Sequence, residues 1–293
     1  MRNALGPPKR RRAGSDVNSR QAHPGVSTSL PLLSRAQVSR IRELSRDKHA
    51  RQTDGTFVVE GAKAVRDLLS QHPNLVRAVV ATPAYLEREP ASDRALREAI
   101  QASSYSCKEH AFGRLSDLET PQGILAVAVQ SPWNEERVLS QPVLFGIWGE
   151  AIRDPLNVGS MIRTAAALGV SALWLSPDSA DPYSSKAVRA SAGALFTLPV
   201  FTNSNIGTLT DRGCAFYAAV SHGGHGTVPM CDIERVPQRM ILAVGNEGQG
   251  LSTQTIRQAT SRFTIPLSRH VESLNVAATV AIAAFYFGRL PRD

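Results

Sequence analysis

The chain has 293 residues, 42% of them hydrophobic and 20% charged, and carries a formal net charge of +8. This length allows two domains with a sizeable core, and the basic excess favours a polyanionic partner such as nucleic acid. No apolar run reaches the ~18–20 residues of a membrane span, and three cysteines without a CxxC pair argue against disulfides or a metal centre. We therefore expect no membrane, no metal and a reducing compartment.

Residues 1–33 form a basic tail with six basic residues and one acidic residue, which leaves +3 for the other 260 residues. Its prolines and lack of periodicity predict disorder. Because the basic excess lies largely in the tail, an RNA-contacting arm and a tail without a specific role both stay open. The tail has no apolar run of a secretory signal, so we expect a cytoplasmic protein, while its basic, serine-containing composition leaves organellar import open.

Residues 34–130 are predicted to form a small α/β domain. Ser34 and Gln37 have the spacing of a capping box, which predicts a helix that begins there. Hydrophobic periodicity predicts strands at 57–59, 75–80 and 124–129, and helices at 62–69 and 91–102. Residues 131–142, which include Pro132, then serve as the linker.

Residues 143–293 alternate strand and helix patterns. The predicted strands cover 143–148, 172–175, 198–201, 215–220, 240–244 and 263–266. The predicted helices cover 158–168, 184–192, 252–261 and 273–289. Near-continuous apolar strands separated by helices indicate a mainly parallel sheet with helices on both faces.

Three turns in this second domain are rich in Asn, Gly, Pro or Ser, at 154–159, 245–250 and 265–275. Each follows an apolar strand pattern and precedes a helix pattern. Turns of this kind lie at the carboxyl ends of strands, where ligands bind in α/β sheets. We therefore expect the three turns to form one composite site.

The residue types at these turns suit a flat organic ligand. Glycines such as Gly245 let main-chain groups approach closely, while amides and two charges supply polar contacts. The candidates from the residues alone are Ile265, Leu267 and Leu274 as apolar walls, Asn157, Asn246 and Asn275 as amides, and Glu247 and Arg163 as charges. A lone Asn also suits a helix cap and an Arg the surface, so these alternatives stay open.

Other site patterns are poorly supported. The glycine-rich turn lacks the Lys-Ser/Thr of a P-loop, no GxGxxG follows the first strand of the domain, and there is no GxSxG elbow. His222 and His225 have an HxxH spacing but no carboxylate at helical spacing, which favours a loop over a metal site.

The second domain resembles the SpoU/TrmH family of S-adenosylmethionine-dependent RNA ribose methyltransferases. The family's three motifs occur in order at 157–170, 244–251 and 265–276, and 186–193 resembles its intervening helix. Residues 57–61 resemble part of the small RNA-binding domain that precedes many members, a weaker match.

The resemblance implies a deep trefoil knot that holds S-adenosyl-L-methionine, with Gly245, Ile265 and Leu274 contacting it and Leu267 lining the pocket. It also implies a homodimer in which each active site is completed by the partner. The apolar final helix, from Val276 onward, supports such an interface. Burial within one subunit is the alternative.

The implied reaction moves a methyl group to a ribose 2′-oxygen, with catalytic roles for Asn157, Arg163, Glu247 and Asn275. A guanidinium keeps its proton, so Arg163 suits a phosphate-holding, alkoxide-stabilising role better than that of a base. The RNA phosphate or Glu247 then takes the proton, while Asn157 and Asn275 orient their neighbours.

The expected substrate is structured RNA, ribosomal rather than transfer RNA, because an added RNA-binding module suits a large substrate. A transfer-RNA methylase and a non-catalytic RNA-binding or ribosome-assembly factor on the same scaffold are the alternatives. A generic nucleotide-binding domain is a third.

Overall fold

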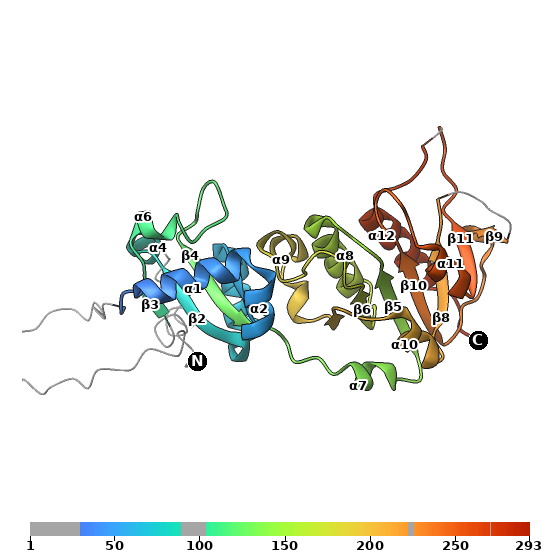
Figure 1. Cartoon of the computed structure of the whole chain (residues 1–293), viewed down its shortest axis with the longest axis horizontal. Helices are drawn as coiled ribbons and strands as arrows, with labels where there is room; N and C mark the ends of the chain where they lie inside the picture. Colours follow the sequence, from blue (N-terminus) through green and yellow to red (C-terminus); the bar gives the residue numbers. More distant parts are fainter. Residues whose placement is uncertain (1–29, 89–103, 222–225, 270) are drawn as a thin grey trace, which may run out of the picture. The chain divides into compact units, whose positions relative to one another are not determined.

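The chain divides into two units, Met1–Gln130 and Ser131–Asp293. The computed structural model describes residues 30–88, 104–221, 226–269 and 271–293 (Figure 1). The helix expected at 91–102, the turn with His222 and His225, and most of the expected tail lie outside the described residues. In the described part of the chain, no helix combines the length and apolar character needed to cross a bilayer.

The N-terminal unit contains a four-stranded mixed sheet in the order β1-β4-β2-β3. Strand β4 is antiparallel to both β1 and β2, and β3 is parallel to β2. The strands are β1 (Thr56–Glu60), β2 (Val76–Ala81), β3 (Ser104–Ser106) and β4 (Ile124–Val129). The helices are α1 (Arg35–Arg46), α2 (Lys48–Asp54), α3 (Ala62–Gln71), α4 (Pro83–Arg88) and α6 (Glu109–Phe112), with a 3₁₀ turn at Pro73–Leu75.

The start of this unit follows the sequence prediction with one correction. Ser34 and Gln37 form the predicted capping box of α1, and the helix buries Ile41 and Leu44 in the unit's core. The last residues of the expected tail are ordered. The Leu33 N–H donates to the Ser106 carbonyl at 3.1 Å, so the chain pairs with β3 before α1 begins.

The C-terminal unit contains a seven-stranded sheet in the order β7-β6-β5-β10-β8-β11-β9, and every strand pair in it is parallel. This confirms the predicted parallel α/β domain. The strands are β5 (Leu144–Gly149), β6 (Ala172–Leu175), β7 (Val200–Phe201), β8 (Ala215–Ala219), β9 (Thr227–Pro229), β10 (Arg239–Val244) and β11 (Ser261–Thr264).

Helices cover both faces of this sheet (Figure 1). One face packs against α7 (Glu135–Leu139), α10 (Ile206–Asp211) and α11 (Thr253–Gln258). The other carries α8 (Pro155–Ala167), α9 (Ser185–Ser191) and α12 (Val276–Phe287), with 3₁₀ turns at Ala194–Phe196 and Met230–Asp232. Helices α8 and α9 pack closely because Gly159 has no side chain: a Cβ there would lie 2.4 Å from the Ala187 carbonyl oxygen.

Several elements differ from the sequence prediction, and three of the differences are at helix starts. Helix α7 occupies part of the expected linker. Helix α8 begins at Pro155, capped by Asp154, so Asn157 lies in its first turn rather than before the helix. Helix α12 begins after Asn275, whose side chain caps it, so residues 273–274 stay outside the helix. The cap sets each start because it satisfies N–H groups that have no partner within the helix.

Candidate active site

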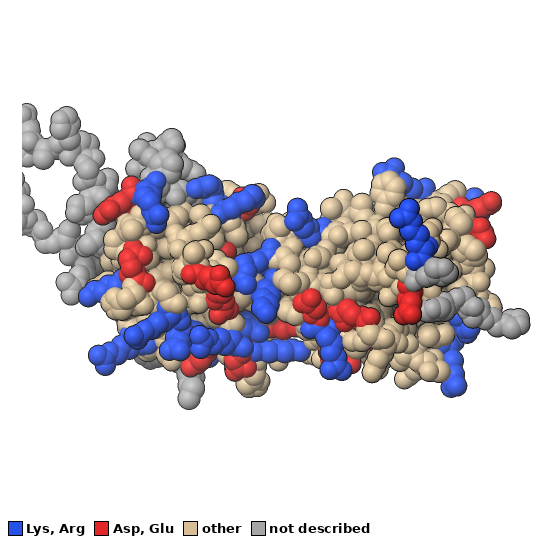
Figure 2. Space-filling model, turned by 90° about the horizontal axis from the view of Figure 1, so that it is seen from above, with Lys and Arg blue, Asp and Glu red and all other residues tan. Residues whose placement is uncertain are grey.

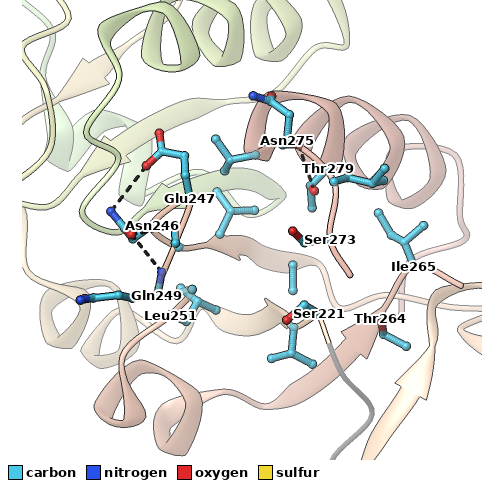
Figure 3. Close-up of a pocket in the computed structure, with 18 of the residues that line it drawn as sticks. Ser221, Asn246, Glu247, Gln249, Leu251, Thr264, Ile265, Ser273, Asn275 and Thr279 are labelled. Carbon is cyan, nitrogen blue, oxygen red and sulfur yellow. Dashed lines mark hydrogen bonds between the residues drawn. The ribbon is translucent and has the colours of Figure 1, made fainter. Parts of the chain in front are cut away.

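A cavity of about 590 Å³ lies at the carboxyl ends of the adjacent strands β10, β8 and β11. One wall is the β10–α11 loop, which we define as residues 245–252, and the other is the β11–α12 segment, residues 265–275 (Figure 3). Of the eight residues to which the family resemblance gave a role, six line the cavity: Gly245, Glu247, Ile265, Leu267, Leu274 and Asn275. The fold thus brings the second and third motifs together, as expected for turns at one edge of a parallel sheet.

The β10–α11 loop folds back on itself, and Gly245 makes this possible. Asn246 and Gly250 exchange two backbone hydrogen bonds of 3.0 and 2.9 Å. A Cβ at Gly245 would lie 2.2 Å from both the Gly250 carbonyl carbon and the Leu251 nitrogen. Any side chain at residue 245 therefore forces this loop to move.

The Asn246 side chain holds the same loop to a second one. Its Oδ1 accepts from the Gly248 and Gln249 N–H groups at 2.9 and 3.0 Å, as Figure 3 shows in part. Its Nδ2 donates to the Ala151 carbonyl at 2.9 Å, and Ala151 has a left-handed backbone with φ of 52°. Sequence reasoning counted Asn246 only as one amide among three, whereas the structure makes it the fastening point of the loop.

A chain of side-chain hydrogen bonds joins all three motifs. Asn157 Nδ2 donates to Glu247 Oε1 at 2.8 Å. Asn275 Nδ2 donates to Asn157 Oδ1 at 2.9 Å, while Asn275 Oδ1 caps α12 by accepting from the Ala277 N–H. Asn157 is buried and does not line the cavity, so its contacts hold the two cavity walls to α8.

The carboxylate of Glu247 is well supplied with donors. Besides Asn157, the N–H groups of Arg153 and Asp154 approach it at 3.4 Å. Partial burial by itself raises the pKa of Glu247, but these hydrogen bonds outweigh it and hold the pKa below its ordinary value. The group is therefore ionised at neutral pH and a poor proton acceptor.

A second carboxylate, Glu150, anchors the far end of the loop and was missed by sequence reasoning. It accepts hydrogen bonds of 2.8 Å from the N–H and hydroxyl of Ser252 and from the Thr255 hydroxyl. Ser252 is the N-cap of α11, so Glu150 fixes where the loop ends. The one sequence signal that could have identified Glu150 is its position directly after β5, because the carboxyl ends of the strands form the edge of the sheet that holds the cavity.

Arg163 is the predicted site residue that lies apart from the others. It is exposed on α8 and does not line the cavity. Within the described part of the chain, its side chain forms no hydrogen bond or ion pair. Its guanidinium is therefore available to a molecule outside this chain.

The cavity suits S-adenosylmethionine. Its volume lies in the range of ~300–1,000 Å³ found for small-molecule sites. Main-chain groups beside Gly245 face an apolar wall from Ile265, Leu267 and Leu274, as a purine ring with polar edges requires. Among the described residues, no three His, Cys, Asp or Glu side chains are grouped to hold a metal ion.

Comparison with known proteins matches each unit separately. Residues 145–285 match the SpoU rRNA methylase family, and residues 35–126 match the MRM3-like substrate binding domain. The 23S rRNA (guanosine(2553)-2′-O)-methyltransferase RlmP of Bacillus subtilis is 31% identical over 82% of this chain and 91% of its own length. The chain belongs to the SpoU rRNA methylase family.

Solved structures of SpoU-type proteins superpose along most of the chain. An AdoMet-bound rRNA methyltransferase from Sinorhizobium meliloti is 25% identical, with a TM-score of 0.73 over 88% of this chain and 96% of that one. A TrmH-family RNA methyltransferase from Porphyromonas gingivalis is 31% identical, with a TM-score of 0.71 over 87% and 98%. The resemblance inferred from the three motifs is thereby confirmed, and the MRM3-like match covers the unit for which the sequence gave the weaker resemblance.

Proposed function

We propose that this protein transfers a methyl group from S-adenosylmethionine to a ribose 2′-hydroxyl of ribosomal RNA. The observation that carries the proposal is the cavity whose two walls are joined by the Glu247–Asn157–Asn275 chain. The B. subtilis relative, named a 23S rRNA 2′-O-methyltransferase, supports ribosomal over transfer RNA.

In this proposal, the residues of the two walls hold the cofactor. Gly245 admits it to the backbone of the β10–α11 loop, and Ile265, Leu267 and Leu274 cover its apolar parts. The bound cofactor supplies a methyl group already activated by a sulfonium. The protein then has to position the ribose, stabilise the emerging alkoxide and give the hydroxyl proton an exit.

Arg163 is proposed to bind the RNA phosphate beside the target ribose. Its guanidinium is exposed and stays protonated, so it stabilises negative charge and does not act as a base. The 2′-oxygen gains the methyl group and releases its proton. Because the Glu247 carboxylate is already held by Asn157 and by two backbone N–H groups, we assign it a positioning role, and the proton leaves through the RNA phosphate or to solvent.

We further propose a homodimer. Helix α12 leaves Ile282 and Phe285 40% and 52% exposed, and the neighbouring helix α8 leaves Leu156 51% exposed. Exposed apolar side chains on adjoining helices fit a self-complementary interface. Arg163 lies on the exposed side of α8 too, so a second copy would meet it. A Phe285→Glu variant is expected to elute as a monomer in size-exclusion chromatography with light scattering; a wild-type monomer would contradict the proposal.

The knot of the family is also proposed here. After β10 the chain passes to β11, two strands away, and returns so that α12 packs on α8 and β10. The returning β11–α12 segment faces the β10–α11 loop across the cavity. A knot requires the C-terminal segment to return in this way, so the path supports the proposed knot.

The decisive experiment is an Arg163→Ala variant. It is expected to abolish methyl transfer to large-subunit ribosomal RNA and to leave cofactor affinity, measured by calorimetry, nearly unchanged. Loss of cofactor affinity would contradict the assigned role. A wild-type protein that binds neither S-adenosylmethionine nor its demethylated product would contradict the proposed function itself.

A second measurement separates the substrate classes. Mapping 2′-O-methyl positions in ribosomal and transfer RNA from cells with and without the gene identifies the modified nucleotide. A missing methyl group in transfer RNA alone would favour the alternative substrate. Unchanged methylation of both would favour a non-catalytic RNA-binding role.

A further inference from the structure

Helix α1 in the N-terminal unit carries an arginine stripe, which we define as Arg35, Arg42 and Arg46. Spacings of seven and eleven residues place the three on one side of a helix, over about 16 Å at 1.5 Å per residue. All three are exposed, whereas Ile41 and Leu44 on the opposite side are fully buried. Figure 2 shows basic side chains gathered in a row along the lower edge of this unit.

The charge of the stripe is not neutralised locally. Within the described part of the chain, none of the three arginines forms an ion pair or a side-chain hydrogen bond. The one acid of the helix, Glu43, pairs with Arg40 at 2.6 Å, and Arg40 also binds Asp54 at 2.6 Å. Asp47, which ends the helix, caps α2 by accepting from the His49 N–H. The nearby carboxylates are thus engaged elsewhere.

Helix stability does not explain the stripe. Arg35 lies in the first turn of α1, which contains no acidic residue. The helix dipole disfavours a cation at that end, by roughly 0.3–1 kcal/mol at an exposed position. Arg46 in the last turn is favourable to the dipole, but Arg42 in the middle gains nothing from it. A polyanion along the helix would offset the unfavourable charge and use all three residues.

We propose that the arginine stripe binds successive phosphates of the substrate RNA. The guanidinium's forked donors suit phosphate oxygens, and a linear array of like charges suits a nucleic-acid backbone rather than a compact anion. The contact is with phosphates, so it adds affinity and orientation without reading sequence. The inference rests on the proposed function for the identity of the RNA.

The test compares two triple variants of the full chain. The first is Arg35→Gln, Arg42→Gln and Arg46→Gln. The matched control removes the same charge from exposed arginines scattered over α4, α7 and α11: Arg88→Gln, Arg137→Gln and Arg257→Gln. Gln and Arg have similar helix propensities, and thermal unfolding checks that both variants fold. The N-terminal tail is kept in each, so its contribution is common.

The binding of a large-subunit ribosomal RNA transcript is measured against salt concentration. Each phosphate contact in single-stranded RNA contributes roughly 0.7 to the slope of log affinity against log salt concentration. The slope of the stripe variant should therefore be smaller by about 2, and that of the control should change much less. In methyl transfer, the stripe variant should show a raised KM for RNA with kcat and cofactor affinity unchanged. A merely structural role for the stripe would not produce this separation.

Two results would overturn the proposal: an unchanged slope in the stripe variant, or an equal loss in the scattered control, which would reduce the effect to net charge. Weaker binding to anionic phospholipid vesicles with unchanged RNA binding would assign the stripe to a membrane surface instead. A wild-type protein that binds RNA through the stripe yet transfers no methyl group would leave this inference standing and end the proposed function.

Discussion

The two walls of the cavity are held in very different ways. The β10–α11 loop is tied by the Asn246 side chain, by the Glu247 carboxylate and, at its end, by Glu150. In the β11–α12 segment up to Leu274, the described residues form one hydrogen bond, from the Val271 N–H to the Ser268 carbonyl at 3.4 Å. In this segment Val271 is 53% exposed and Arg269 has a left-handed backbone with φ of 60°.

This difference separates a wall that is shaped in advance from one that a ligand has to order. A pre-shaped loop loses little conformational freedom on binding, whereas a loosely held segment loses more. Changes that disturb the contacts holding the β10–α11 loop should therefore alter cofactor affinity strongly. Changes in the β11–α12 segment that leave its apolar side chains in place should alter it little.

The largest effect is expected from Gly245→Ala. The new methyl group would lie 2.2 Å from the backbone of Gly250 and Leu251, which cannot move without breaking the loop. Overpacking of this kind costs ~1–3 kcal/mol, so cofactor affinity should fall roughly tenfold or more. Calorimetric titration measures it, with Gly248→Ala as the control because a Cβ there meets nothing closer than 3.6 Å. Equal losses in both variants would contradict the assignment.

The next largest loss of cofactor affinity is expected from Asn246→Ala. It removes the four side-chain hydrogen bonds of Asn246, each worth ~0.5–1.5 kcal/mol. We expect a cofactor affinity lower by roughly tenfold. Asn246→Asp separates the contributions, because it keeps the acceptor for Gly248 and Gln249 and loses the donor to Ala151 and Glu247. An Asp variant with wild-type affinity would show that the link to Ala151 does not shape the site.

Glu247→Gln is expected to have a smaller effect, a pH-dependent change in thermal stability. The pKa of Glu247 is lower in the folded protein than in the unfolded chain, so its ionised form stabilises the fold above the unfolded value of about 4.3. That contribution is lost as the pH falls through the folded pKa. The melting temperature of wild type should therefore decline more steeply below roughly pH 5 than that of the variant. If the melting temperatures of wild type and variant changed with pH in parallel, Glu247 would not be one of the residues that hold the β10–α11 loop.

The smallest effect is expected from Arg269→Gly in the loosely held wall. Glycine relieves the left-handed strain of ~1 kcal/mol but adds freedom to the unfolded chain, and the two offset each other. Cofactor affinity should stay within about twofold. Ala151→Gly is the matched change beside the tied loop, because Ala151 also has a left-handed backbone, with φ of 52°. A tenfold loss for Arg269→Gly would abolish the distinction between the walls.

Much of the C-terminal unit could be predicted because its signals are local. Apolar runs such as 240–244 and 172–175 became parallel strands. In the N-terminal unit, Ser34 capped a helix as its spacing from Gln37 indicated. The position of turns after strands also predicted that residues 245–250 and 265–275 would meet. The roles of the individual side chains there remain predictions for the variants above.

The amino-acid sequence by itself determined the parallel α/β class, because hydrophobic periodicity depends on neighbouring residues. The order of the three motifs along the chain determined the family and, with it, the grouping of Gly245, Ile265 and Leu274. Only the tertiary structure decided that Asn157 lies behind the cavity, that Arg163 lies off its wall, and that Glu150 anchors Ser252. These contacts join residues 90 to 118 positions apart in the chain. They depend on the strand order that sets β10 beside β5 and β8, for which no local pattern exists.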